Sequence, residues 1–197
     1  MPLNAPLQTN ELTPDTALLV AVGNGDAAAA RLLVARLTPR LFSHATRVLG
    51  DRTEAEDAVQ ETLLRLWQIA PNWRQGEAQV STWCYRVLVN LCTDRLRARR
   101  PSVDIDAIAE PPADLKSVVE KMTDAARSDA LSHALAALPY RQKQAVALRH
   151  IEELGNPEIA EIMDISVEAV ESLIARGKRT LKAALEGRRD ELGYDHD

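Results

Sequence analysis

The chain is predicted to be all-α, with two small helical domains joined by an acidic, extended linker. Two observations favour helices over strands. Aromatic residues make up only 4% of the 197 residues and glycines number eight, whereas strands are enriched in aromatic side chains and tight turns in glycine. Hydrophobic residues make up 46% and charged residues 27%, proportions that favour a packed globular chain over a disordered one.

The linker is predicted where acidic residues and prolines gather. Residues 104–114 contain four acidic residues, no basic residue and the pair Pro111-Pro112. Proline disfavours helix in the residue before it, and like charges repel, so this segment is expected to be extended. We therefore predict an N-terminal domain over residues 12–100, a linker over 101–123 and a C-terminal domain over 124–187.

Five helices are predicted in the N-terminal domain, separated by turn and cap signals. The Gly-Asn-Gly turn at 23–25 ends the first helix, Pro39 separates the second from the third, and Gly50 ends the third. Thr53 and Ser81 are predicted N-caps of the fourth and fifth, because a hydroxyl can accept a hydrogen bond from a first-turn N–H. The predicted helices span residues 15–22, 26–37, 38–49, 53–70 and 81–100.

Four helices are predicted in the C-terminal domain, and the last two form a helix-turn-helix. Asn156 is a predicted N-cap followed by Pro157 at the first helical position, and Ser166 caps the final helix. Asp164 occupies the turn, where aspartate tolerates left-handed backbone geometry. The predicted helices span residues 128–138, 140–152, 157–163 and 167–185.

Helical spacing places Leu64 on the face of the fourth helix that lies opposite its apolar stripe. Asp57, Gln60 and Glu61 surround it on that face. An apolar side chain ringed by polar ones is typical of a small protein-docking surface. Single exposed leucines are also common on ordinary solvated faces, so both interpretations stay open at this point.

A polar stripe with three arginines runs along the fifth helix. Its members recur at steps of four, three, four and three residues: Arg86, Asn90, Thr93, Arg97 and Arg100. Residues 86–100 hold five arginines against one aspartate, a local charge of +4 in a chain whose net charge is −5. Because arginine pairs in bidentate fashion with phosphate and with guanine edges, the stripe predicts nucleic-acid binding.

Two tryptophans lie beside the start of this stripe. Trp73 belongs to the preceding loop and Trp83 to the first turns of the helix. Unpaired bases stack on aromatic rings while cations follow the backbone, as single-stranded nucleic acid requires. Trp83 is predicted to be part of the core, whereas Trp73 fits a core position and a base-stacking position equally well.

The final helix presents an outward face whose side chains can reach base edges in the major groove. That face consists of Glu168, Ser172, Arg176 and Arg179, with Glu171 at its edge. A helix pair without a nucleic-acid role is the alternative interpretation.

Three segments, in this order, resemble bacterial RNA polymerase sigma factors of the extracytoplasmic-function (ECF) type, in the sigma-70 family. AEDAVQETLLRLW (55–67) is similar to regions 2.1 to 2.2, and STWCYRVLVNLCTDRLRARR (81–100) to regions 2.3 to 2.4. Residues 137–185 are similar to region 4. The chain departs from the family at Glu171 and Leu173, where members often carry basic residues.

The resemblance implies a role for each surface. Binding to the β′ clamp helices of core RNA polymerase would fall to Asp57, Gln60, Glu61 and Leu64. Recognition and melting of the −10 element would fall to Trp73, Arg86, Asn90, Arg97 and Arg100. Reading of the −35 element in promoter DNA would fall to Glu168, Glu171, Ser172, Arg176 and Arg179, while the outer surface of that domain meets the β flap.

The resemblance further implies a transcription initiation factor that is not an enzyme, needs no cofactor or metal, and is controlled by an anti-sigma factor. A dimeric helix-turn-helix repressor is an alternative. A thiol enzyme built on Cys84 or Cys92 is disfavoured, because no histidine has a motif spacing to either cysteine. No basic residue precedes Arg31 and no apolar run approaches about 20 residues, so a cytoplasmic protein without membrane insertion is predicted.

Overall fold

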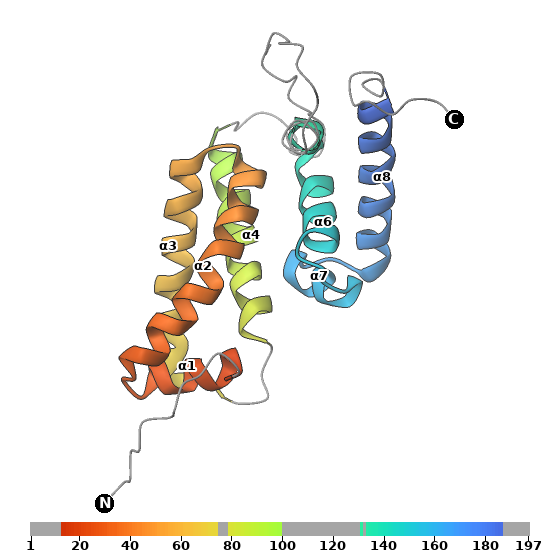
Figure 1. Ribbon diagram of the computed structural model, residues 1–197. Coiled ribbons are helices and arrows are strands. Elements are labelled where there is room, and N and C mark those ends of the chain that lie inside the picture. The colour runs from red at the N-terminus through yellow and green to blue at the C-terminus, as the bar shows by residue number, and fades with distance from the viewer. Residues whose placement is uncertain (1–12, 75–78, 100–130, 132, 187–197) are drawn as a thin grey trace, which may run out of the picture. The chain divides into compact units, whose positions relative to one another are not determined.

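The structure, a computed structural model, describes residues 13–74, 79–99, 131 and 133–186, and these form helices and the turns between them (Figure 1). The chain divides into two compact units, which are described separately. The N-terminal unit contains α1 (Asp15–Gly23), α2 (Ala27–Leu49), α3 (Arg52–Ile69), the short 3-10 helix η1 (Ala70–Asn72) and most of α4 (Val80–Arg99). The C-terminal unit contains α6 (Tyr140–His150), α8 (Val167–Glu186) and all of α7 (Asn156–Met163) except its last three residues.

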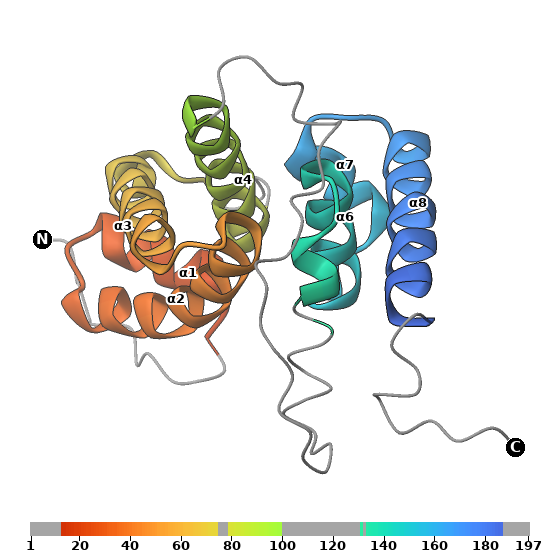
Figure 2. The same cartoon turned by 90° about the horizontal axis from the view of Figure 1, so that it is seen from above.

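In the N-terminal unit, α2, α3 and α4 run alongside one another and α1 crosses one end (Figures 1 and 2). The core between them consists of aliphatic side chains that are almost fully buried, among them Leu18, Leu33, Leu41, Leu66 and Leu88. Burying this apolar surface is the main favourable contribution to the stability of the unit.

The predicted break at Pro39 is wrong, because α2 continues through this proline from Ala27 to Leu49. A proline inside a helix removes one backbone hydrogen bond and costs about 3 kcal/mol. Here the buried stripe continues on both sides of it through Leu37, Leu41 and Ala45, while Pro39 itself is exposed. Burial of the continuous stripe therefore outweighs the local cost, and the missing hydrogen bond lies on the solvent side.

Three predicted helix starts are displaced by one or two residues. Asp51, and not Thr53, caps α3, because its Oδ1 accepts a hydrogen bond from the Glu54 N–H at 2.9 Å. Helix α4 begins at Val80, so Ser81 lies inside its first turn. Gly155 takes the N-cap position of α7, where an extended backbone suffices and the Asn156 side chain is left to point elsewhere.

Gly23, the last residue of α1, allows a close approach of α1 to η1. A Cβ atom at this position would lie 2.5 Å from the backbone oxygen of Ala70. Backbone atoms cannot move aside as a flexible side chain does, so a larger residue must separate the two elements.

We expect Gly23→Ala to destabilise the N-terminal unit by about 1–3 kcal/mol, the usual cost of overpacking. Urea unfolding followed by tryptophan fluorescence measures this, because Trp67, Trp73 and Trp83 all belong to that unit. Ala35→Ser, at an exposed position of α2, is the matched control and should cost no more than about 0.5 kcal/mol. Equal midpoints for Gly23→Ala and wild type would show that the close approach is not needed.

The C-terminal unit packs α6 against α8 around a cluster of Leu135, Leu138 and Val146. Gly177 permits this contact, because a Cβ there would lie 2.6 Å from Cγ2 of Val146. Asp164 takes the predicted left-handed conformation (φ 52°, ψ 52°) in the turn between α7 and α8. The start of the predicted helix 128–138 lies outside the described residues. Within this predicted helix, the structure shows residues 133–136 as helical.

Candidate nucleic-acid and protein interfaces

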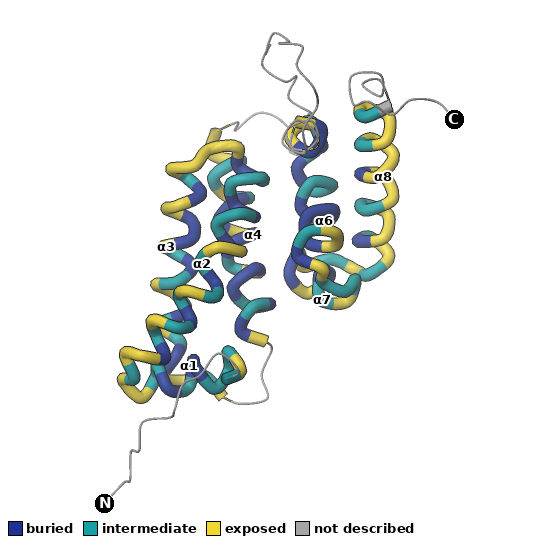
Figure 3. Tube along the Cα trace, in the orientation of Figure 1, coloured by how far each residue is buried: buried dark blue, intermediate teal, exposed yellow. Residues whose placement is uncertain are grey.

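The outward face of α3 carries an exposed leucine, as predicted. Leu64 is 60% exposed, and Leu131 is the only other exposed large hydrophobic side chain among the described residues. Asp57 and Gln60 on the same face are exposed, and the Glu61 carboxylate forms an ion pair with Arg65 one turn later. The opposite side of α3 is buried through Ala58, Thr62 and Leu66, so the two faces differ sharply (Figure 3). We define Asp57, Gln60, Glu61 and Leu64 as the α3 face.

The basic stripe on α4 lies on the solvent side of the helix. Arg86, Asn90 and Arg97 are exposed, whereas Thr93 is half-buried and its hydroxyl donates to the Val89 carbonyl at 2.7 Å. Arg100 lies outside the described residues. The other side of α4 is apolar and buried in the core. Because this burial fixes the orientation of the helix, the arginines of the stripe face outward.

Trp73 and Trp83 contact each other at the start of α4. Their ring centroids are 6.5 Å apart and their planes meet at 87°, an edge-to-face pair. Both rings are half-buried, so Trp83 is less buried than a core position requires and Trp73 is only partly available for stacking. A base that stacks here would meet a two-ring cluster, not one free ring.

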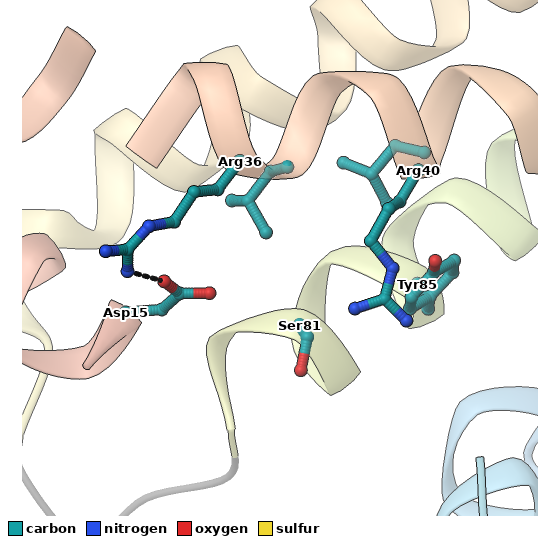
Figure 4. A pocket seen from close by; sticks show the side chains of 7 residues that line it. Asp15, Arg36, Arg40, Ser81 and Tyr85 are labelled. Carbon is teal, nitrogen blue, oxygen red and sulfur yellow. Dashed lines mark hydrogen bonds and ion pairs between the residues drawn. The ribbon is translucent and has the colours of Figure 1, made fainter. Parts of the chain in front are cut away.

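A cavity of about 280 Å³ opens beside the first turns of α4, between α1, α2 and α4 (Figure 4). At one end, Arg36 binds the Asp15 carboxylate at 2.9 Å and donates to the Thr13 carbonyl at 2.6 Å. At the other end, Arg40 extends from α2 toward Ser81 and Tyr85. No local sequence pattern connects Arg40 with Ser81 and Tyr85, which lie 41 and 45 positions further along the chain.

His44 is a buried titratable side chain of α2 whose ring packs against Tyr85, one of the residues that line this cavity. It is fully buried, and neither ring nitrogen has a hydrogen-bond partner. Its ring and that of Tyr85 form a T-shaped pair with their centroids 5.5 Å apart. Burial, helped by the nearby charge of Arg47, lowers the pKa of His44 from 6.5 to about 4. His44 is therefore neutral in the folded protein at pH 7.

This pKa makes the N-terminal unit sensitive to acid. The unfolded chain takes up a proton near pH 6.5 and the folded chain only near pH 4, so stability is complete above about pH 6.5 and falls as the pH falls toward 4. We expect His44 to contribute a loss of up to about 3 kcal/mol over this window. Urea unfolding at pH 7 and pH 5 should show a smaller loss for His44→Leu than for wild type, with exposed His133→Gln as the control. Equal losses in His44→Leu and wild type would contradict this assignment.

The two cysteines lie in the core of the N-terminal unit. Both are free thiols, and both are buried. Burial, with a smaller contribution from the charge of Asp15, raises the pKa of the Cys84 thiol to about 12. A thiol with this pKa stays protonated at neutral pH, which makes it a poor nucleophile. Within the part of the chain that the structure describes, no group of three or more histidine, cysteine or acidic residues is arranged to hold a metal ion.

The outward face of α8 is exposed at every predicted position: Glu168, Glu171, Ser172, Arg176 and Arg179. Val170 and Gly177 on the opposite side are buried, and in Figure 3 the exposed residues of α8 lie on the side away from α6. The Ser166 hydroxyl accepts from the Ala169 N–H at 3.2 Å, which confirms it as the cap of this helix. We define these five exposed residues as the α8 face.

The C-terminal helices α7 and α8 form a helix-turn-helix whose second helix is exposed and charged, the arrangement by which a large class of DNA-binding proteins reads the major groove. Residues 33–101 match the family model for Sigma-70 region 2, and residues 128–181 match the model for Sigma-70, region 4. The chain is 32% identical over 183 residues to the ECF RNA polymerase sigma-E factor of Haemophilus influenzae, covering 87% of this chain and 95% of that protein. It is 28% identical over 174 residues to the ECF RNA polymerase sigma factor SigW of Bacillus subtilis, covering 83% and 92%. The chain belongs to the ECF group of the sigma-70 family, whose members direct RNA polymerase to promoters.

Solved structures show the same fold. CnrH, solved with the cytosolic domain of CnrY, superposes with a TM-score of 0.64 at 24% identity, covering 88% of this chain and 97% of that one. RpoE from Bartonella quintana, solved with the anti-sigma factor NepR, gives a TM-score of 0.59 at 22% identity, covering 78% and 94%. In the part of the chain described here, none of the helices has the length and apolar character needed to cross a bilayer.

Proposed function

We propose that this sigma factor binds core RNA polymerase through the α3 face and reads promoter DNA through α4 and the α8 face. The observation that carries the proposal is the exposure of Leu64 on the same unit that turns Arg86 outward. A partner that covers Leu64 removes an apolar side chain from water and brings the arginine stripe to the DNA at the same time.

The α4 stripe is proposed to act on the −10 element. Arg86, Asn90 and Arg97 follow the phosphates, and the pair formed by Trp73 and Trp83 offers an aromatic surface to unpaired bases. Arg40 adds a cation from α2 beside the start of α4, which supports an extension of the same surface.

The α8 face is proposed to enter the major groove at the −35 element. Arg176 and Arg179 suit guanine edges and phosphates, and Ser172 can donate to or accept from a base edge. Domain boundaries of 12–100 and 124–187, joined by a linker over 101–123, are proposed with this division of labour. The matches to region 2 and region 4 models support it.

Regulation by an anti-sigma factor is proposed as well. Two solved structures with the same fold are complexes, one with the cytosolic domain of CnrY and one with the anti-sigma factor NepR. Such a partner would cover the surfaces that polymerase and DNA need. We also propose that the protein is cytoplasmic. We propose further that it has no catalytic activity of its own, because the buried, protonated thiol of Cys84 supports no thiol chemistry.

A gel shift with promoter DNA tests this proposal against a dimeric repressor. The chain alone should bind duplex DNA weakly, because its net charge is −5. Chain and core polymerase together should give a stable, promoter-specific complex that core polymerase alone does not form. Tight binding of the chain alone to a palindromic duplex, unchanged by core polymerase, would favour the repressor.

A further inference from the structure

The charge of α8 changes sign along its length. Residues 167–175 contain two glutamates and no basic residue, whereas residues 176–182 contain four basic residues and no acidic one. The second helix of a helix-turn-helix contacts base edges chiefly through its N-terminal residues. The part of α8 that would meet the bases is therefore acidic, although DNA phosphates repel carboxylates.

The first of these two glutamates is engaged with the helix end. Hydrogen bonds from its own backbone N–H and from the Ser166 side chain lower the pKa of the Glu168 carboxyl. Carboxylates in the first turn stabilise a helix through its free N–H groups and its dipole. Glu168 thus has a structural role that needs no DNA.

Glu171 lies almost one turn later, beyond those N–H groups. It is exposed, and Asn156 Nδ2 at the start of α7 approaches its Oε1 at 3.5 Å. The other amide atom of Asn156, Oδ1, is buried and has no partner among the described residues. The amide therefore turns its nitrogen toward the carboxylate. At 3.5 Å this contact is at the outer limit of a hydrogen bond, so it favours one direction of the carboxylate without covering it.

An oriented carboxylate in the major groove accepts hydrogen bonds and cannot donate them. Guanine presents two acceptors there and thymine one, so both repel it, and adenine pairs its amino group with the acceptor N7. Cytosine presents the N4 amino group alone and is the base that glutamate recognises.

We propose that Glu171 selects a cytosine within the −35 element and that Asn156 positions it. The inference rests on the proposed function of the α8 face and narrows it: Glu168 serves the helix end and Glu171 serves base recognition. Asn156 is a positioning residue that acts through the Glu171 carboxylate.

The test uses full-length chain with core RNA polymerase and a promoter library randomised at the −35 element. Bound promoters are sequenced for wild type, Glu171→Gln, Glu171→Ala, Asn156→Ala and the control Glu161→Gln, an exposed acid on α7. Wild type should prefer cytosine at one position by at least about tenfold. Glu171→Gln should change the preferred base there to adenine, which glutamine reads through N6 and N7. Glu171→Ala should abolish the preference, Asn156→Ala should weaken it several-fold, and Glu161→Gln should leave it unchanged.

Three results would overturn the inference while the proposed function stands. Wild type could show no cytosine preference, or Glu171→Gln could keep the cytosine preference of wild type. The third is that the Glu171 variants lose affinity for all promoters equally and keep the base choice of wild type. A holoenzyme that selects no −35 sequence at all would instead contradict the proposed function. Thermal melting of each variant establishes that it is folded before its base preference is compared.

Discussion

Replacing Leu64 and Gln60 together with alanine should weaken the binding of core RNA polymerase by about 10- to 100-fold. Leu64 is 60% exposed in the free chain, and a leucine at the centre of a polar rim loses its exposure only when a partner covers it. Truncating an anchor of this kind costs about 1–3 kcal/mol in protein interfaces. Fluorescence anisotropy of labelled chain titrated with core polymerase measures the change.

The control for this variant is Arg31→Ala, at an exposed residue of α2 outside the α3 face. It should bind core polymerase like wild type. Because neither Leu64 nor Gln60 is buried, the double variant should also keep the unfolding midpoint of wild type. Wild-type affinity in the double variant would show that the α3 face is not the docking surface.

The second large effect is expected from Arg86→Ala combined with Arg97→Ala. Both side chains are exposed on α4 and each is proposed to neutralise a phosphate of the −10 strand. Losing two such contacts should lower promoter affinity of the holoenzyme about tenfold or more and reduce the slope of log affinity against log salt by roughly 1.4 to 1.8. Titrations of holoenzyme with promoter DNA at several salt concentrations give both numbers.

Arg31→Ala, an exposed arginine on α2, controls for the loss of positive charge as such. It should leave the salt slope unchanged. A normal slope in the double variant would place the phosphates elsewhere, and an equal loss in Arg31→Ala would indicate non-specific attraction. Binding of core polymerase should be unaffected by the α4 changes, which separates them from the α3 face.

The sequence was sufficient for features that depend on local periodicity. The wheel of α3 predicted that Leu64 is exposed opposite Ala58 and Leu66, and the structure shows this. The left-handed turn at Asp164 and the Ser166 cap were likewise predicted from residue type. Each of these depends on residues within one or two turns of each other.

The predictions that were wrong concern competition between local signals and packing. Pro39 is a strong break signal, but burial of Leu37 and Leu41 on one continuous face keeps α2 intact. At the start of α3, Asp51 and Thr53 both suit an N-cap, and only the backbone geometry at Asp51 decides between them.

Contacts between distant segments could not be predicted from the sequence at all. Arg40 meets the start of α4, and Asn156 meets Glu171, because the fold brings separate helices together. The role of Glu168 also emerged only from its hydrogen bonds, which distinguish it from Glu171 on the same face. Helical spacing alone places Glu168 and Glu171 together on the outward face of the final helix.

Run-off transcription tests the central claim most directly. Core RNA polymerase is incubated with fragmented genomic DNA, with and without the chain, and the 5′ ends of the transcripts are mapped. We expect the chain to produce a discrete set of start sites that share −10 and −35 sequences and that are absent with core polymerase alone. Identical start sites in both reactions would contradict the assignment of this chain as a promoter-directing factor.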